Sequence, residues 1–185
     1  MEIRGCKKSP FHLCLVKQLA PLFGLLLIGC VATVKTYQHP QQSFSDYETW
    51  CWLEGCEVVY QGPEHYYDQR TMEDITNLIA QHMYEKGYKQ SDDSSDLAVN
   101  YFVVIKEDST TISDEYGDII ASPYYPQYER FLKGTLVIDV IDRRKSEVVW
   151  RSTADRYMEI NPEYDPEMIQ KAVAKSMKKL PSRPQ

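Results

Sequence analysis

The chain holds 185 residues, with 21 basic and 27 acidic side chains and a net charge of −6 at pH 7. This acidic balance argues against nucleic acid and against anionic lipid headgroups as partners, because both are bound through clustered Lys and Arg side chains. The length without the predicted leader suits one ordinary domain with a sizeable core, so no second domain is expected.

Residues 1–29 have the layout of a secretory signal peptide, with an apolar run over residues 19–29. The basic residues that precede this run are Arg4, Lys7, Lys8 and Lys17. Pro21 and Gly24 interrupt the run, which is also shorter than the roughly 20 residues that a membrane-spanning helix needs. A spanning anchor stays open as the alternative, since residues 18–34 carry no charge.

The tetrapeptide Leu27-Ile28-Gly29-Cys30 closes the apolar run and resembles the lipobox of bacterial lipoproteins. By this resemblance, Cys30 becomes the first residue of the mature protein and carries a diacylglyceryl thioether and an acylated amine. More than one acyl chain converts marginal membrane binding into a stable anchor. Val31 follows where Asp would favour the inner membrane, so the resemblance implies the periplasmic face of the outer membrane. Inner-membrane anchoring is the alternative.

Cys51 and Cys56 remain after the cysteines of the leader and of the lipid site are set aside. In one continuous strand they would lie about 16 Å apart, so a disulfide needs a turn over residues 53–55, which Gly55 permits. A disulfide in an oxidising compartment and two free thiols both stay open. No metal site is predicted, because no other Cys or His lies at ligand spacing.

Residues 30–45 are polar and lack periodicity, which predicts a lipidated flexible tether ahead of a single α+β domain over residues 46–185. Residues 47–53 alternate and favour a first strand. A helix is predicted from an N-cap at Thr71 to Lys86, with Gly87 as the residue that ends it. Its buried positions, at helical spacing, are Met72, Ile75, Leu78, Ile79 and Met83.

Residues 97–105 are apolar on both faces, which predicts a central strand. Residues 106–132 have no clean period and contain two prolines, so they predict a long loop that is either functional or disordered. The tyrosines of this loop are Tyr116, Tyr124, Tyr125 and Tyr128. Tyrosine gives a broad contact surface with few rotors to freeze, which suits binding of a protein, a glycan or a peptidoglycan strand. The alternative is that the rings cover one end of the sheet.

Residues 134–141 and 147–157 flank the charged turn 142–146 and predict a β-hairpin. Asp165 and Pro166 then form a cap and first turn for a second helix that ends before Pro181. The element order is β-α-β-loop-β-β-α. It predicts an α+β fold with a mostly antiparallel sheet of about four strands and two helices packed on one face.

With these elements placed, the region from about Phe44 to Pro181 resembles the Gram-negative lipoproteins grouped as domain of unknown function 4136. The resemblance is carried by residues 44–53, Lys86-Gly87-Tyr88, residues 96–101, residues 134–139 with Val149-Trp150-Arg151, and the lysine-rich final helix ending in Leu180-Pro181. Cys51 and Cys56 do not belong to the family pattern. The resemblance implies an envelope lipoprotein without an established activity, and it supplies no functional residues.

The sequence holds none of the common catalytic motifs, such as G-x-S-x-G, H-E-x-x-H, C-x-x-C or a glycine-rich loop. We therefore predict no catalytic residue and no cofactor. His82 is interpreted as a residue of a helix face. Asp139 and Asp142 could bind a cation or act as paired carboxylates, but we expect them to face water beside Arg143 and Arg144 at the end of the hairpin.

Three functional hypotheses follow from these residues. The first is a non-enzymatic binding or assembly module on a lipid anchor, which uses loop 106–132 and neighbouring sheet edges to contact an envelope protein or peptidoglycan. The second is a carrier of a small ligand or lipid, with a cavity between the helices and the sheet. The third is a hydrolase that works through Asp139 or His82, which requires a cleft containing either residue.

Overall fold

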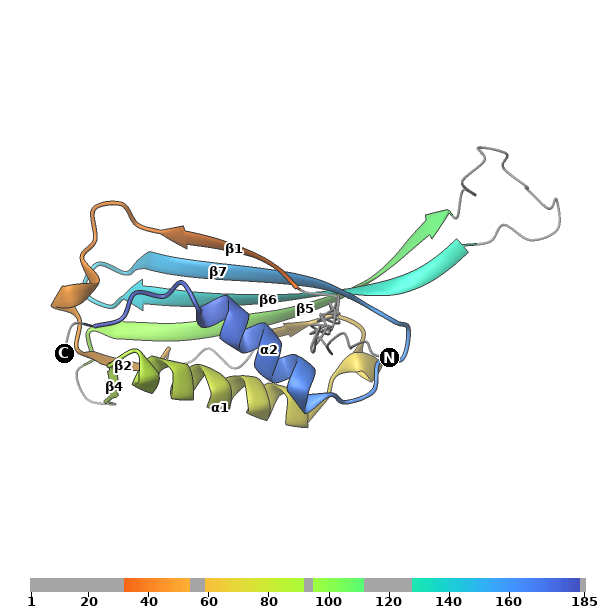
Figure 1. The fold of residues 1–185 in the computed structure, drawn as a ribbon, viewed down its shortest axis with the longest axis horizontal. Helices are drawn as coiled ribbons and strands as arrows, with labels where there is room; N and C mark the ends of the chain where they lie inside the picture. The colour runs from red at the N-terminus through yellow and green to blue at the C-terminus, as the bar shows by residue number, and fades with distance from the viewer. Residues whose placement is uncertain (1–31, 54–58, 92–94, 112–127, 184–185) are drawn as a thin grey trace, which may run out of the picture.

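The computed structural model describes residues 32–53, 59–91, 95–111 and 128–183. These residues form one mixed sheet in the order β1-β7-β6-β5-β2-β4, with β3 also paired to β5 (Figure 1). The strands are β1 (Thr33–Gln38), β2 (Thr49–Trp52), β3 (Val59–Gln61), β4 (Lys89–Gln90), β5 (Leu97–Thr111), β6 (Tyr128–Asp142) and β7 (Glu147–Met158). The helices are α1 (Gln69–Glu85) and α2 (Pro166–Met177), with short 3-10 turns at Phe44–Asp46 and Glu64–Tyr66.

The predicted sheet of about four mostly antiparallel strands is wrong. The described sheet has seven strands, and the pairs β2–β4, β2–β5 and β3–β5 are parallel. Parallel neighbours need a crossover connection, and α1 provides it because it lies in the chain between β2 and β5. The strands that were not predicted are β1, β3 and β4, which are short or polar and so give a weak alternation signal.

Strand β1 also corrects the predicted flexible tether over residues 30–45. Residues 33–38 pair with β7 without interruption, from Thr33 opposite Asp155 to Gln38 opposite Trp150. A strand at the edge of a sheet is held by backbone hydrogen bonds, and its side chains remain free to be polar. Phe44, in the following 3-10 turn, is buried in the core. The ordered domain therefore extends upstream of residue 46.

Both predicted helices are present, and their ends follow local chemistry. Helix α1 begins after Asp68 rather than Thr71, because the Asp68 carboxylate accepts the Arg70 amide at 3.0 Å. Its last residue is Glu85, and after the cap at Lys86 comes Gly87, the predicted stop, whose φ of +89° favours glycine. In α2 the Asp165 carboxylate accepts the Met168 amide at 3.0 Å, and Pro166 opens the first turn as predicted.

The two helices pack side by side on one face of the sheet (Figure 1). Their buried stripes meet alternate residues of the central strands. The core residues from these strands are Leu97, Val99, Tyr101, Val103, Leu136, Ile138, Val140, Val149, Trp150 and Ala154. Of the helices within the described ranges, none combines the length and the apolar character needed to cross a bilayer.

Strands β5, β6 and β7 form the long centre of the sheet, and β5 is central as predicted. The predicted hairpin between β6 and β7 is present, with a bulge between Val140 and Ile141. Both β5 and β6 are longer than expected, at 15 residues each, and take in the two ends of the predicted loop 106–132. The remainder of that loop, residues 112–127, lies outside the described residues.

Candidate functional site

Asp142, predicted to face water, is buried at the end of β6. Its carboxylate accepts the Tyr47 hydroxyl at 2.9 Å and the backbone amides of Arg144 and Lys145 at 2.9 and 3.1 Å. Burial raises the pKa of Asp142, but these hydrogen bonds outweigh burial and hold the pKa below its usual value. The prediction failed because Tyr47 comes from a distant part of the chain and covers the carboxylate.

Asp139 is also buried, which corrects the same prediction. Its two oxygens accept Nε and Nη2 of Arg151 at 2.5 and 2.6 Å, in a bidentate pair across β6 and β7. The hydrogen bond to Asp139 raises the pKa of Arg151 above its ordinary value. Donors of the protein thus occupy both carboxylates that were candidates for cation binding or acid–base chemistry.

Asp96, which is not among the predicted site residues, completes the polar cluster at this end. Its carboxylate accepts the amides of Glu48 and Thr49 at 2.8 and 3.1 Å, and Arg144 Nη2 at 2.7 Å. Burial raises the pKa of Asp96, and the hydrogen bonds more than offset this, so the pKa lies below its usual value. We call Tyr47, Asp96, Asp142 and Arg144 the hairpin corner. Both of its carboxylates, buried Asp142 and half-buried Asp96, accept several hydrogen bonds from the protein.

Of the other predicted site residues, His82 and Cys51 lie on different elements. His82 lies half-buried on α1, with Nδ1 2.9 Å from Glu85 Oε2. Cys51 is buried in β2, and its predicted disulfide partner Cys56 lies outside the described residues. Cys30 lies outside them as well. Within the described ranges, His, Cys, Asp and Glu side chains form no group of three that could hold a metal ion.

The structure describes one of the four tyrosines of the predicted loop. Tyr128 begins β6, with its backbone opposite Thr111 of β5. Tyr116, Tyr124 and Tyr125 lie outside the described residues, in the segment of sequence that joins β5 to β6. The structure therefore shows that the strands bordering this segment are paired with each other up to residues 111 and 128.

These two strands continue past their neighbours and form an arm, which we define as residues 108–111 of β5 and 128–131 of β6. Among the described residues, β7 pairs with β6 only as far as Leu132, and β3 pairs with β5 only as far as Val104. Figure 1 shows the arm extending away from the rest of the sheet. Both of its outer edges thus present backbone N–H and C=O groups without a strand partner in the described part of the chain.

The described side chains of the arm and its base include the charged and polar groups of Glu107, Asp108, Ser109 and Arg130. Arg130 pairs across the strands with Glu107, and Asp108 and Ser109 are exposed. The Ser109 amide donates to the Asp108 carboxylate at 2.8 Å, so it is not used to pair with β6. Phe131 packs edge-on against Tyr157, with 5.2 Å between ring centroids, and fixes the arm to the end of β7.

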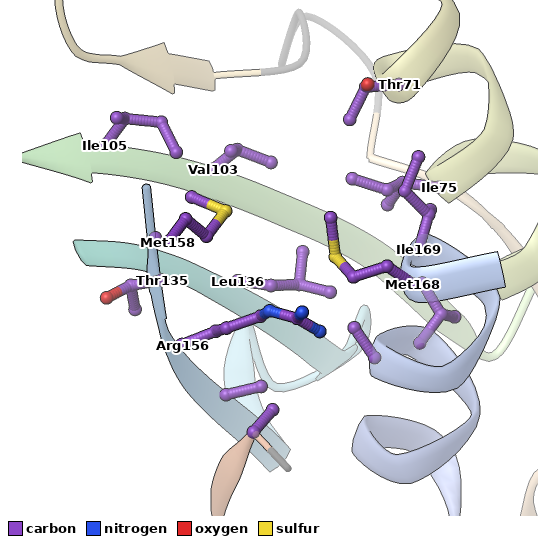
Figure 2. Close-up of a pocket in the computed structure, with 15 residues that line it drawn as sticks. Thr71, Ile75, Val103, Ile105, Thr135, Leu136, Arg156, Met158, Met168 and Ile169 are labelled. Carbon is purple, nitrogen blue, oxygen red and sulfur yellow. The ribbon is translucent and has the colours of Figure 1, made fainter. Parts of the chain in front are cut away.

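A second feature is an apolar cavity of about 110 Å³ between the helices and the sheet (Figure 2). It is lined by Ala32, Thr71, Ile75, Val103, Ile105, Gly134, Thr135, Leu136, Ala154, Arg156, Met158, Met168, Ile169, Ala172 and Val173. An adjoining cavity of similar volume shares Met158 and Met168 with it and continues toward Tyr60 and Tyr164. Neither His82 nor Asp139, the residues of the hydrolase hypothesis, lines these two cavities.

Of the described residues that line the first cavity, Arg156 is the one with a charge. Figure 2 shows its side chain extending from β7 toward α2, beside Met168 and Leu136. Its Nε is buried and has no hydrogen-bond partner among the described residues. Arg156 is not among the residues predicted from the sequence, although the strand period identifies it. Trp150, Ser152 and Ala154 face the helices, and Arg156 continues the same alternation.

A family model described as "Domain of unknown function (DUF4136)" matches residues 34–182. A crystal structure of a DUF4136 family protein from Bacteroides thetaiotaomicron is 18% identical, with a TM-score of 0.50, and covers 80% of this chain and 94% of that chain. At this identity the likeness concerns the fold alone. No curated protein matches the sequence.

Two further solved structures are similar at lower TM-scores. A PelC dodecamer from Paraburkholderia phytofirmans is 12% identical, with a TM-score of 0.47, and covers 83% of this chain and 100% of that chain. A minor lipoprotein from Acinetobacter baumannii is 13% identical, with a TM-score of 0.35, and covers 73% of this chain and 93% of that chain.

Proposed function

The chain belongs to the domain of unknown function 4136 (DUF4136) family, and from that premise we propose that it is a non-enzymatic binding or assembly module of the cell envelope. A lipid on Cys30 tethers it to the periplasmic face of the outer membrane. The partner is an envelope protein or a peptidoglycan strand. The observation that carries the proposal is the arm, which leaves the body of the sheet with both edges open.

Open edges favour binding because an added strand gains a row of main-chain hydrogen bonds. Proteins usually blunt such edges with charge, and the ion pair of Glu107 and Arg130 does so at the base of this arm. The tyrosines at positions 116, 124 and 125 lie in the sequence between the end of β5 and the start of β6. They would add contact area of the kind that interfaces favour, because the ring is broad and loses few rotamers on binding.

The test removes the tyrosines and leaves the sheet unchanged. We expect Tyr124→Ala with Tyr125→Ala to retain the circular dichroism spectrum and the unfolding midpoint while losing an envelope component that crosslinks to the unaltered protein in intact cells. The matched control is Tyr37→Ala with Tyr84→Ala, two exposed tyrosines on β1 and α1 that lie outside the arm. An identical crosslinking pattern for both double variants would refute the proposal.

The anchor has a separate test. Cys30→Ser removes the thiol that would carry the lipid, so we expect the protein to leave the membrane fraction and to lose labelling by radioactive palmitate. Cys51→Ser is the control, because that thiol is buried within β2 and lies in the folded domain. Continued membrane retention of Cys30→Ser would instead favour a spanning helix within residues 18–34.

A second candidate function, carriage of a small ligand or lipid, is favoured by the apolar cavity between the helices and the sheet. Its volume of about 110 Å³ is below the ~300 Å³ at which ordinary ligand pockets begin. Met158 and Met168 line both this cavity and the adjoining one, and methionine side chains move readily. Rotation of these two side chains would join the cavities and admit a longer chain.

A further inference from the structure

We infer that the cavity takes a single alkyl chain with a terminal carboxylate, and that Arg156 holds the carboxylate. The inference rests on the second candidate function and adds the chemical class of the ligand. Its first ground is the shape and chemistry of the wall. Aliphatic side chains from α1, α2, β5 and β6 form most of the lining, which suits a hydrocarbon chain and offers few hydrogen bonds to a polar one.

The second ground is the charge of Arg156. A guanidinium group at an apolar wall is costly unless its donors are used, and the buried Nε has no hydrogen-bond partner in the described part of the chain. The ion pairs between described residues do not include Arg156, whereas Arg151 on the same strand is paired with Asp139. The planar fork of arginine matches a carboxylate in a bidentate manner, so a fatty-acid headgroup supplies the missing acceptor.

The charge around the cavity also orients the chain. At the end formed by Ala32, Lys175 donates to the Ala32 carbonyl and adds a second positive charge near the first cavity. The adjoining cavity is lined instead by Asp68, Glu163 and Asp165, which would repel an anionic headgroup. The carboxylate therefore lies beside Arg156, and the alkyl chain runs past Met168 and Met158 toward the adjoining cavity.

Gly134, which also lines the cavity, leaves space for the Met158 side chain. It lies opposite Arg156 in the β6–β7 pair, and a Cβ at this position would come within 2.8 Å of Met158 Cε. Glycine thus lets the end of Met158 lie close to the strand, where the methionine can move aside for a chain.

The test uses two photoreactive probes that share a ten-carbon chain, decanoic acid and decanol, each bearing a diazirine near the tail. Membranes containing the full chain are irradiated, and labelled peptides are identified by mass spectrometry. We expect decanoic acid to label the segments around Met158 and Met168 saturably. Arg156→Gln should lower this labelling about tenfold or more, while labelling by decanol changes less than twofold. Arg156→Lys, which keeps the charge, should retain part of it.

Two controls separate the possible failures. Lys171→Gln removes a positive charge from the exposed side of α2 and should leave labelling by both probes unchanged. Ala172→Leu fills the cavity from α2 and should lower labelling by both probes. Circular dichroism establishes that each variant is folded.

The outcomes are distinct. Equal labelling by both probes, unchanged by Arg156→Gln but lowered by Ala172→Leu, would overturn the carboxylate assignment and leave the carrier function standing. Labelling that is insensitive to Ala172→Leu, or absent from the cavity segments, would overturn the carrier function together with this inference.

Discussion

The two ends of the long central strands differ in whether their polar groups have hydrogen-bond partners. At the hairpin corner, the buried carboxylate of Asp142 and the half-buried carboxylate of Asp96 accept several hydrogen bonds each from nearby donors. At the opposite end, the arm leaves two strand edges open, and the Arg156 Nε is buried without a partner among the described residues. The difference indicates that the hairpin corner serves stability and that the arm end serves binding, since unsatisfied groups persist where function needs them.

The largest effect that this comparison predicts is at Asp142. Asp142→Ala leaves three donors without their acceptor in a buried site, so we expect the free energy of unfolding to fall by about 2–4 kcal/mol. Urea unfolding measures this change. The matched control is Asp108→Ala on the exposed arm, for which we expect a change within about 0.5 kcal/mol. Equal losses at the two positions would remove the distinction between the two ends.

A smaller effect at the same corner depends on pH. The pKa of Asp142 is lowered in the fold, so its ionised form stabilises the protein above the unfolded pKa of about 3.9, and this stabilisation is lost as the pH falls through the folded pKa. Tyr47→Phe removes one donor to the carboxylate. We expect it to cost about 1–2 kcal/mol at pH 7 and progressively less as the pH falls through the folded pKa of Asp142. A cost that is the same at pH 7 and at the lowest pH at which the protein stays folded would contradict this account.

At the arm end of the sheet, removal of a polar group is expected to raise the stability of the protein instead of lowering it. Arg156→Met keeps an apolar stem of similar length and removes a buried Nε that has no partner in the described structure. We expect the unliganded protein to become more stable by about 0.5–1 kcal/mol, while decanoic acid no longer labels the cavity. Thermal unfolding of the variant provides the measurement. A loss of stability greater than about 1 kcal/mol would show that Arg156 supports the fold.

The smallest effect on stability is predicted for the edge of the arm. The Ser109 amide donates to the Asp108 carboxylate, so Ser109→Pro takes no hydrogen bond from the β5–β6 pair, while the proline ring obstructs an added strand at the open edge. We expect a change within about 1 kcal/mol and a clear loss of crosslinking to the envelope partner. Ser109→Ala, the control, should crosslink like the unaltered protein. If Ser109→Pro also does so, the edge is not the contact surface.

The sequence predicted those elements whose signals are local. Gly87, Asp165 and Pro166 marked helix ends, and apolar runs marked β5 and the β6–β7 hairpin. It did not predict β1, because residues 33–38 are mostly polar and are held by backbone pairing with a strand far along the chain. The parallel pairing of β2 with β5 is likewise a long-range choice, which propensity does not encode.

The candidate site residues also divide into those that local sequence predicts and those whose environment depends on long-range contacts. The sequence predicts that Asp142 faces water, because the residues next to it in the sequence are charged. Its burial depends on Tyr47, which contacts it only in the fold. Arg156 was within reach of a local argument, since it follows Ser152 and Ala154 at strand spacing. A charged residue on the buried face of a strand is the signal that would have identified the cavity wall.

The central claim, that the arm end of the sheet is the binding end, has one direct test. A photo-crosslinking amino acid is placed in the full chain either at Asp108 on the arm or at Glu147, an exposed residue at the start of β7 beside the hairpin corner. Irradiation of intact cells should yield a discrete crosslinked envelope product from position 108 and none from position 147. A product from position 147 with none from position 108 would contradict the claim.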